Sequence, residues 1–206
     1  DTHGYGLLTL KGVFEKSSNV GFAKAVNKYY KDDPKRFVEH LYKMGLNEPL
    51  HLQIAGGQNP VIRKPGDRWW DGTTLTNMAY GYALLLTPMK TLTFYNAVAN
   101  DGRMVSPLFV KELRQYGQTL RTYRARTMVS SIASDETLKE VRAAMRGVVE
   151  EGTGRILKSR YYKVGGKTGT AQINANEPNH ALFVSFAPYS NPEISVTVQI
   201  PNGYTS

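Results

Sequence analysis

Apolar residues recur at intervals of three and four through the first 45 positions, which is the spacing of amphipathic helices. Three helices are predicted there, over residues 9–16, 20–30 and 34–44. Thr9 is a candidate N-cap for the first, and Asp33 with Pro34 supplies a cap and an N1 proline for the third. Gly45 is placed to end the third helix. The beginning of the chain is therefore expected to be mainly helical.

The middle of the chain mixes helical spacing with irregular sequence. Residues 46–75 are rich in Gly, Pro and Asn, and loops of that length are usually functional or well packed. A helical region is expected after them, interrupted at Thr87 and Pro88, another cap and N1 proline, and then continuing until Asn100-Asp101-Gly102. Short strands are predicted at 103–105 and 109–116.

A long amphipathic helix is predicted from Asp135 to Glu151, closed by Gly152. After it the pattern becomes rich in β-branched and aromatic residues separated by turn signals such as Glu177-Pro178-Asn179. Strands are predicted at 161–164, 167–173, 181–186 and 194–200. Helices followed by consecutive antiparallel strands indicate an α+β fold, with a mainly helical part over 1–152 and the strands of one sheet over 153–206.

Composition narrows the function without identifying it. The 206 residues are 41% hydrophobic and 21% charged, as in ordinary globular domains, and no apolar run is long enough to cross a bilayer. Cysteine is absent and the four histidines fit no metal-ligand spacing, so we expect neither a metal nor another cofactor. A net charge of +9 invites a nucleic-acid interpretation, but the basic residues are scattered among acids. Nucleic acid is not an expected partner.

Two short motifs carry candidate chemistry. Ser17-Ser18-Asn19 lies where two predicted helices meet, and Lys167-Thr168-Gly169-Thr170 begins a predicted strand. Each has an ordinary explanation: Ser17 or Asn19 could cap the helix that begins near Val20, and the second motif could be an exposed strand start with a glycine bulge. A phosphate-binding loop is excluded, because it would need glycine where Tyr161 stands.

Together the two motifs belong to the set S-x-x-K, S-D-N and K-T-G of serine β-lactamases and penicillin-binding proteins. Over essentially its whole length, and in order, the sequence resembles the transpeptidase domain of class B penicillin-binding proteins, most closely the septal, division-specific branch. The segments that carry the resemblance are Asp1-x-His3…Gly6-Leu7-Leu8-Thr9, Lys16-Ser17-Ser18-Asn19-Val20-Gly21, Tyr80-Gly81…Leu86-Thr87-Pro88, Asn100-Asp101-Gly102-Arg103, Val148-Val149-Glu150-Glu151-Gly152-Thr153-Gly154, Gly165-Gly166-Lys167-Thr168-Gly169-Thr170-Ala171-Gln172, Phe183-Val184-Ser185-Phe186-Ala187-Pro188 and Asn191-Pro192-Glu193-Ile194.

The resemblance implies a penicillin-binding protein/serine β-lactamase-like fold and a serine acyl-transfer reaction that cross-links peptidoglycan stem peptides during cell-wall synthesis. It implies that Ser17 relays protons between the nucleophile and Lys167, and that Asn19 holds a substrate carbonyl. Thr168 and Thr170 would bind the substrate carboxylate, and Gly169 would leave room for the helix of the nucleophile. Implied ligands are stem peptides and β-lactam antibiotics, with division-complex membrane proteins as possible partners. The implied location is the periplasmic face of the bacterial inner membrane, reached through an upstream anchor.

One element of the family pattern is missing. No serine in this sequence has a lysine three positions later, so the nucleophile motif S-x-x-K is absent. We therefore expect the sequence to be a C-terminal fragment of the catalytic domain, inactive alone and with an incomplete sheet. Two alternatives stay open at this point: a serine β-lactamase or β-lactam sensor, and a penicillin-binding module without catalysis.

Overall fold

The computed structural model describes residues 4–172 and 179–201. Its first part is helical, as predicted, with helices α1 (Leu10–Glu15), α2 (Asn19–Tyr30) and α3 (Pro34–Lys43). The caps predicted at Thr9 and Asp33 are confirmed, because their side-chain oxygens accept hydrogen bonds from the backbone N–H groups of Gly12 and Arg36. The alternative explanation of the first motif, a helix cap at Ser17 or Asn19, does not hold. Ser18, rather than Ser17 or Asn19, accepts the N–H of Gly21 at 3.1 Å.

The region after the irregular stretch is less helical than its sequence suggests. The irregular stretch contains β1 (Val61–Ile62) and the start of α4 (Thr74–Met78). After it come β2 (Leu84–Leu85), which pairs with β1, and α5 (Pro88–Ala99). The helix expected between α4 and Thr87 is therefore wrong. Gly81 and Ala83 have φ angles of 101° and 60°, which a right-handed helix does not accommodate. Buried Lys90 ties α5 to the irregular stretch, because its Nζ donates to the carbonyl of Glu48 at 2.8 Å.

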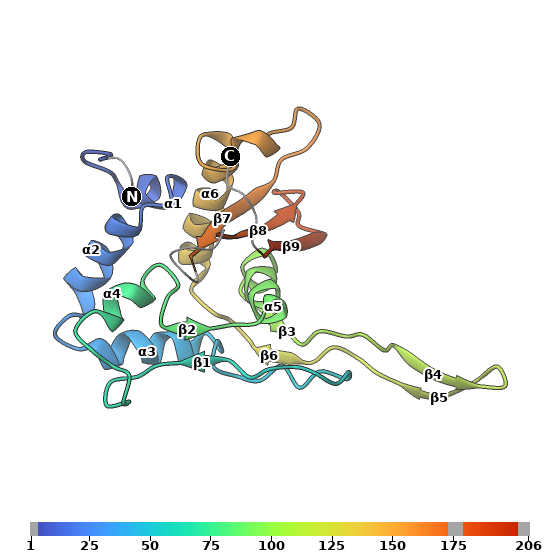
Figure 1. Cartoon of the computed structure of the whole chain (residues 1–206). Helices are drawn as coiled ribbons and strands as arrows, with labels where there is room; N and C mark the ends of the chain where they lie inside the picture. The colour runs from blue at the N-terminus through green and yellow to red at the C-terminus, as the bar shows by residue number, and fades with distance from the viewer. Residues whose placement is uncertain (1–3, 173–178, 202–206) are drawn as a thin grey trace.

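A long β-ribbon projects from the body of the molecule (Figure 1). Its base is β3 (Met104–Val105) with β6 (Thr127–Val129), and its tip is the hairpin of β4 (Glu112–Gln115) and β5 (Gln118–Thr122). The strands β3 and β4, which lead away from the body, were predicted. The strands β5 and β6, which return to the body, were not predicted.

The last part contains α6 (Asp135–Glu150), a 3₁₀ turn η1 (Arg155–Leu157) and an antiparallel sheet of order β7-β8-β9, formed by Gly165–Ala171, His180–Ala187 and Ile194–Ile200. The strand predicted at 161–164 was wrong. Tyr161 and Tyr162 are exposed, and that segment pairs with no strand of the described chain. Ile173 and most of the turn predicted at 177–179 lie outside the described residues, as do Asp1 to His3 of the first resemblance segment.

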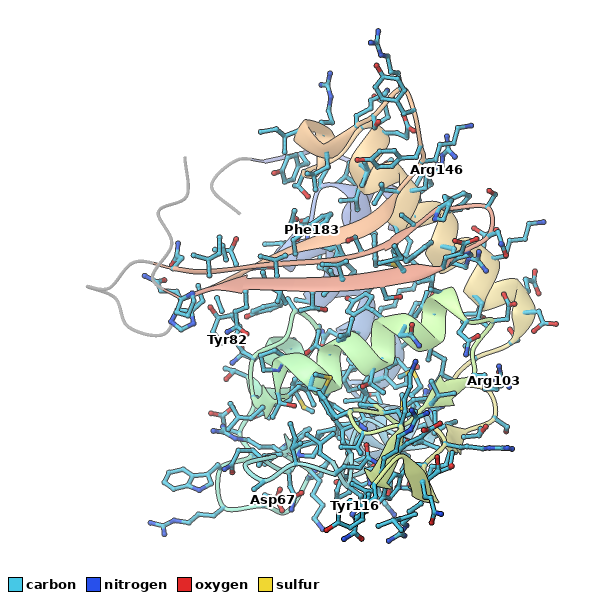
Figure 2. All side chains as sticks on the ribbon, turned by 90° about the vertical axis from the view of Figure 1, so that its right-hand side faces the viewer. Asp67, Tyr82, Arg103, Tyr116, Arg146 and Phe183 are labelled. Atoms are coloured by element: carbon cyan, nitrogen blue, oxygen red, sulfur yellow. The ribbon has the colours of Figure 1, made fainter. Side chains whose placement is uncertain are left out.

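One face of the sheet is packed and the other is open. Helices α5 and α6 lie against the sheet (Figure 2). On the face that they cover, Val184 and Phe186 join the main core. On β9, Ser195 and Thr197 are paired with these residues and share that face, whereas the apolar residues of β9 point away from it. These exposed residues are Ile194, Val196, Val198 and Ile200. Within the described ranges, no helix is sufficiently long and apolar to cross a membrane.

Candidate active site

Ser17 lies at the junction of α1 and α2 in an unusual backbone conformation. Its φ is 54°, in the left-handed region that L-residues other than Asn and Asp rarely occupy. The backbone N–H of Ser17 donates to the carbonyl of Phe14 at 3.1 Å, and that of Ser18 donates to Val13 at 3.0 Å. These two bonds close α1 and reverse the chain, so the Ser17 side chain leaves the helical path and points at the sheet.

Lys167 meets Ser17 from the sheet side. It is paired with Val184 in the sheet register and therefore lies on the packed face. Its Nζ donates hydrogen bonds to Ser17 Oγ and to the carbonyl of Thr168, both at 2.6 Å, and lies 5.8 Å from the centroid of the Phe14 ring. The expectation that side chains 150 positions apart would meet is confirmed.

The surroundings of Lys167 change its proton affinity. Burial disfavours the charged ammonium and lowers the pKa of Lys167 from 10.5 to about 8. A lysine with that pKa exchanges its proton far more readily near neutral pH than an exposed lysine does. The pair of Ser17 and Lys167 can therefore pass a proton between an amine and a hydroxyl.

The register of β7 places the other residues of the Lys167-Thr168-Gly169-Thr170 motif on two different faces of the sheet. Pairing is continuous from Gly165 to Ala171, so Thr168 and Thr170 share one face, while Gly169 shares the other with Lys167. The Thr168 and Thr153 hydroxyls lie 2.6 Å apart. A Cβ added at Gly169 would meet the side chain of Leu182 at 3.4 Å, an ordinary van der Waals contact. Their substrate-binding roles stay predictions.

Asn19 is the first residue of α2, two positions after Ser17, and its residue surface is exposed. The cap at Ser18 fixes the start of this helix and so places Asn19 beside the Ser17 junction. The role of Asn19 in holding a substrate carbonyl also stays a prediction.

Sequence reasoning assigned no role to three residues that shape this site. The ring of Phe14 lies beside the Lys167 amine, Thr153 contacts Thr168, and Tyr82 holds the end of β7. The Tyr82 hydroxyl accepts the backbone N–H of Gln172 at 3.0 Å and lies 3.3 Å from the carbonyl of the same residue. Figure 2 shows Tyr82 near this end of the strands. A lone tyrosine 90 positions from its partner gives no sequence signal of such a contact.

The edge of β7 that faces away from β8 is unpaired among the described strands. An extended peptide can add to such an edge through backbone hydrogen bonds. The site thus combines a serine–lysine pair, two threonine hydroxyls and a free strand edge within one region.

Comparison with known proteins identifies the family of this chain. The family model of the penicillin binding protein transpeptidase domain matches residues 1–206. The chain is 33% identical to penicillin-binding protein PbpB of Mycolicibacterium smegmatis over 96% of this chain and 32% of that protein. It is 31% identical to stage V sporulation protein D of Bacillus subtilis, over 97% of this chain and 31% of that protein.

Solved structures give the same result. Penicillin binding protein 3 of Mycobacterium tuberculosis, complexed with aztreonam, superposes with a TM-score of 0.83 at 29% identity, covering 97% of this chain and 46% of the other. The D,D-transpeptidase domain of a peptidoglycan glycosyltransferase from Eggerthella lenta gives a TM-score of 0.87 at 24% identity, covering 98% and 50%, and supports the fold alone. The chain spans about a third of the length of these curated relatives and about half of these solved chains.

Proposed function

This chain belongs to the transpeptidase domain family of penicillin-binding proteins, and we propose that it forms part of the active site of a peptidoglycan D,D-transpeptidase. The reaction is acyl transfer from the D-alanyl-D-alanine end of one stem peptide to an amine of another. The observation that carries the proposal is the 2.6 Å contact of Lys167 Nζ with Ser17 Oγ, combined with the lowered pKa of Lys167.

The proton relay follows from the direction of that hydrogen bond. Because the Lys167 ammonium donates to Ser17 Oγ, the hydroxyl proton of Ser17 is available for another acceptor. The nucleophilic serine of an S-x-x-K motif attacks the penultimate D-alanyl carbonyl and gives its proton to the motif lysine. The C–N bond then breaks, and the departing D-alanine amine takes a proton from Ser17, which Lys167 replaces.

The second half of the reaction returns both protons. The acceptor amine attacks the acyl ester and loses a proton to Ser17 and the now neutral Lys167. The ester oxygen leaves as the nucleophilic serine and recovers its proton from the motif lysine. A pKa of about 8 suits Lys167 to both directions, since the ammonium predominates near neutral pH while the neutral form lies only about tenfold lower in population.

Substrate binding would use the rest of the β7 motif. The donor peptide would add as a strand to the free edge of β7, with its terminal carboxylate at the hydroxyls of Thr168 and Thr170. Asn19 would hold a peptide carbonyl, and the lack of a side chain at Gly169 would leave room for the helix of the nucleophile. β-Lactams would bind at the same site, consistent with the aztreonam complex of the M. tuberculosis relative.

We also propose the cellular setting. Relatives named for sporulation and for peptidoglycan transpeptidation support a role in wall synthesis outside the cytoplasmic membrane. Membrane anchoring by an upstream segment, a function at division and contacts with division-complex membrane proteins are parts of this proposal.

Acylation by a fluorescent penicillin tests the function. A polypeptide that carries the S-x-x-K motif together with these residues should form a stoichiometric adduct, detected by intact-protein mass spectrometry. The 206-residue chain alone should form none, because no serine has a lysine one helical turn away. Lys167→Ala in the motif-bearing polypeptide should slow acylation by about a hundredfold or more. Acylation of that variant at the parental rate would refute the role of Lys167.

A further inference from the structure

The projecting ribbon has a rigid origin and an isolated tip. We define the arm as residues 107–126, which leave the body between β3 and β6. Backbone bonds continue along it: the N–H of Ser106 donates to the carbonyl of Arg126 at 2.9 Å, and that of Tyr123 donates to Lys111 at 2.8 Å. The amide of Gln53 adds contacts of 2.9 to 3.1 Å to the backbone at Phe109 and Val110. The direction of the arm is therefore fixed at its base.

A tight turn forms the tip of the arm. Tyr116 and Gly117 both have positive φ angles, 49° and 79°, which is the signature of the type I′ turn that matches the twist of a hairpin. Figure 2 looks toward the tip, where Tyr116 is labelled. The arm is thus a defined hairpin.

The arm contributes nothing to the core of this chain. Every residue from Lys111 to Thr122 is exposed, and β4 and β5 pair only with each other among the described strands. Tyr116 is 96% exposed and Leu120 is 63% exposed. A lone two-stranded hairpin is marginally stable in water. Its exposed apolar groups and two free edges are therefore not explained by the folding of this chain.

Charge is concentrated on the arm. It carries Lys111, Arg114, Arg121, Arg124 and Arg126 against a single acid, Glu112, so its net charge is 5 − 1 = +4 out of +9 for the whole chain. Glu112 is already paired with Arg114 at 2.6 Å. The remaining four cations have no carboxylate within 4 Å among the described residues.

We propose that the arm is a docking surface for an extended, acidic segment of a partner protein, which adds a strand to a free edge of the hairpin. Backbone hydrogen bonds along the edge would supply affinity, and carboxylates on the added strand would pair with the basic side chains. The same positive charge opposes pairing between the arms of two copies, so it selects an acidic partner over a second copy.

The arrangement of the apolar groups disfavours a lipid surface. A membrane-bound element needs its apolar side chains on one face. On the arm, Leu113 stands opposite Arg121, and Leu120 lies at the point where the register shifts between Leu113 and Arg114. The apolar residues are therefore interleaved with charge, as suits a partner strand that brings its own carboxylates.

A designed peptide tests this proposal without knowledge of the natural partner. The probe is a fluorescent 12-residue peptide of alternating Glu and Val, and the control peptide has Lys in place of each Glu. Binding is measured by anisotropy at about 50 and 300 mM salt, where screening differs strongly. Backbone hydrogen exchange of the full chain then reports whether the edge amides of β4 or β5 become protected.

Charge reversal on the arm provides the matched variants. Arg121→Glu with Arg124→Glu should weaken binding of the acidic peptide at least about tenfold, because close attractive pairs become repulsive. Lys24→Glu with Lys139→Glu, on exposed positions of α2 and α6, should leave binding within about twofold. Circular dichroism checks that both double variants keep the parental fold.

Three results would overturn the proposal. The first is absence of acidic-peptide binding at low salt, and the second is equal weakening by the two double variants. The third is binding only to vesicles of phosphatidylglycerol and phosphatidylcholine, which would identify the arm as a lipid-binding element. None of these results bears on penicillin acylation, so the arm and the proposed function fail separately.

Discussion

Replacement of Lys167 by methionine should change how the stability of the chain depends on pH. The folded pKa of Lys167 lies below its unfolded value because burial penalises the ammonium. Well below pH 8 the lysine is protonated in both states, and the cost of burying the ammonium is fully present. Between about pH 8 and 10.5 the unfolded chain binds more protons than the folded chain, so stability rises with pH across this window. Methionine has a similar length and does not titrate.

The magnitude follows from the two pKa values. A pKa of about 8 in the folded chain against 10.5 in the unfolded chain corresponds to roughly 3 kcal/mol of linkage, at about 1.4 kcal/mol for each tenfold change. Roughly 2 kcal/mol of this should be recovered between pH 7 and pH 9.5, because the folded lysine is then largely neutral. The parent should therefore gain about that much free energy of unfolding relative to Lys167→Met.

Urea denaturation of both proteins at the two pH values measures this difference in free energy of unfolding, and Lys24→Met, at an exposed position, is measured beside them as a matched substitution. The ¹³Cε resonance of Lys167, assigned by its absence in the variant, should titrate near pH 8. A titration near pH 10.5 together with a pH-independent stability difference would show that Lys167 is not desolvated. That result would contradict the proposed proton relay between Ser17 and Lys167.

Three further predictions concern the site and the sheet. In chemical denaturation, Ser17→Gly should be more stable than Ser17→Ala by about 1 kcal/mol. Both variants lose the contact with Lys167, but only glycine accepts a φ of 54° freely. Equal stabilities would show that the backbone at Ser17 is unstrained. Gly165→Ala should lower the melting temperature, because its Cβ would lie 2.5 Å from the ring of Phe186. Gly169→Ala should not lower it, and the reverse order of melting temperatures would contradict the packing of β7. The chain alone should self-associate through the free edge and exposed apolar row of β9, and Val198→Lys should reduce this in analytical ultracentrifugation; a monomeric parent would contradict it.

The sequence determined the local elements whose signals are short-range. Thr9, Asp33 and Thr87 cap helices where they were predicted to, since an N-cap needs only a side-chain oxygen and an N–H group three residues later. The α+β class and the last strand, Ile194–Ile200, also followed from periodicity. The ordered resemblance identified the family, which the family model and the solved relatives confirm.

Tertiary structure decided which distant residues contact one another and which side chains become buried. Ser17 looks like an N-cap in its local sequence, yet the turn at φ 54° gives the cap to Ser18 and sends the Ser17 hydroxyl to Lys167. The pKa of Lys167 depends on burial between β7 and the Phe14 ring, which no local pattern encodes. The apolar row of β9 was identifiable from alternation, but its exposure depends on which sheet face α5 covers. Short-range hydrogen bonding therefore fixed the elements, whereas long-range packing fixed which side chains meet and how they are charged.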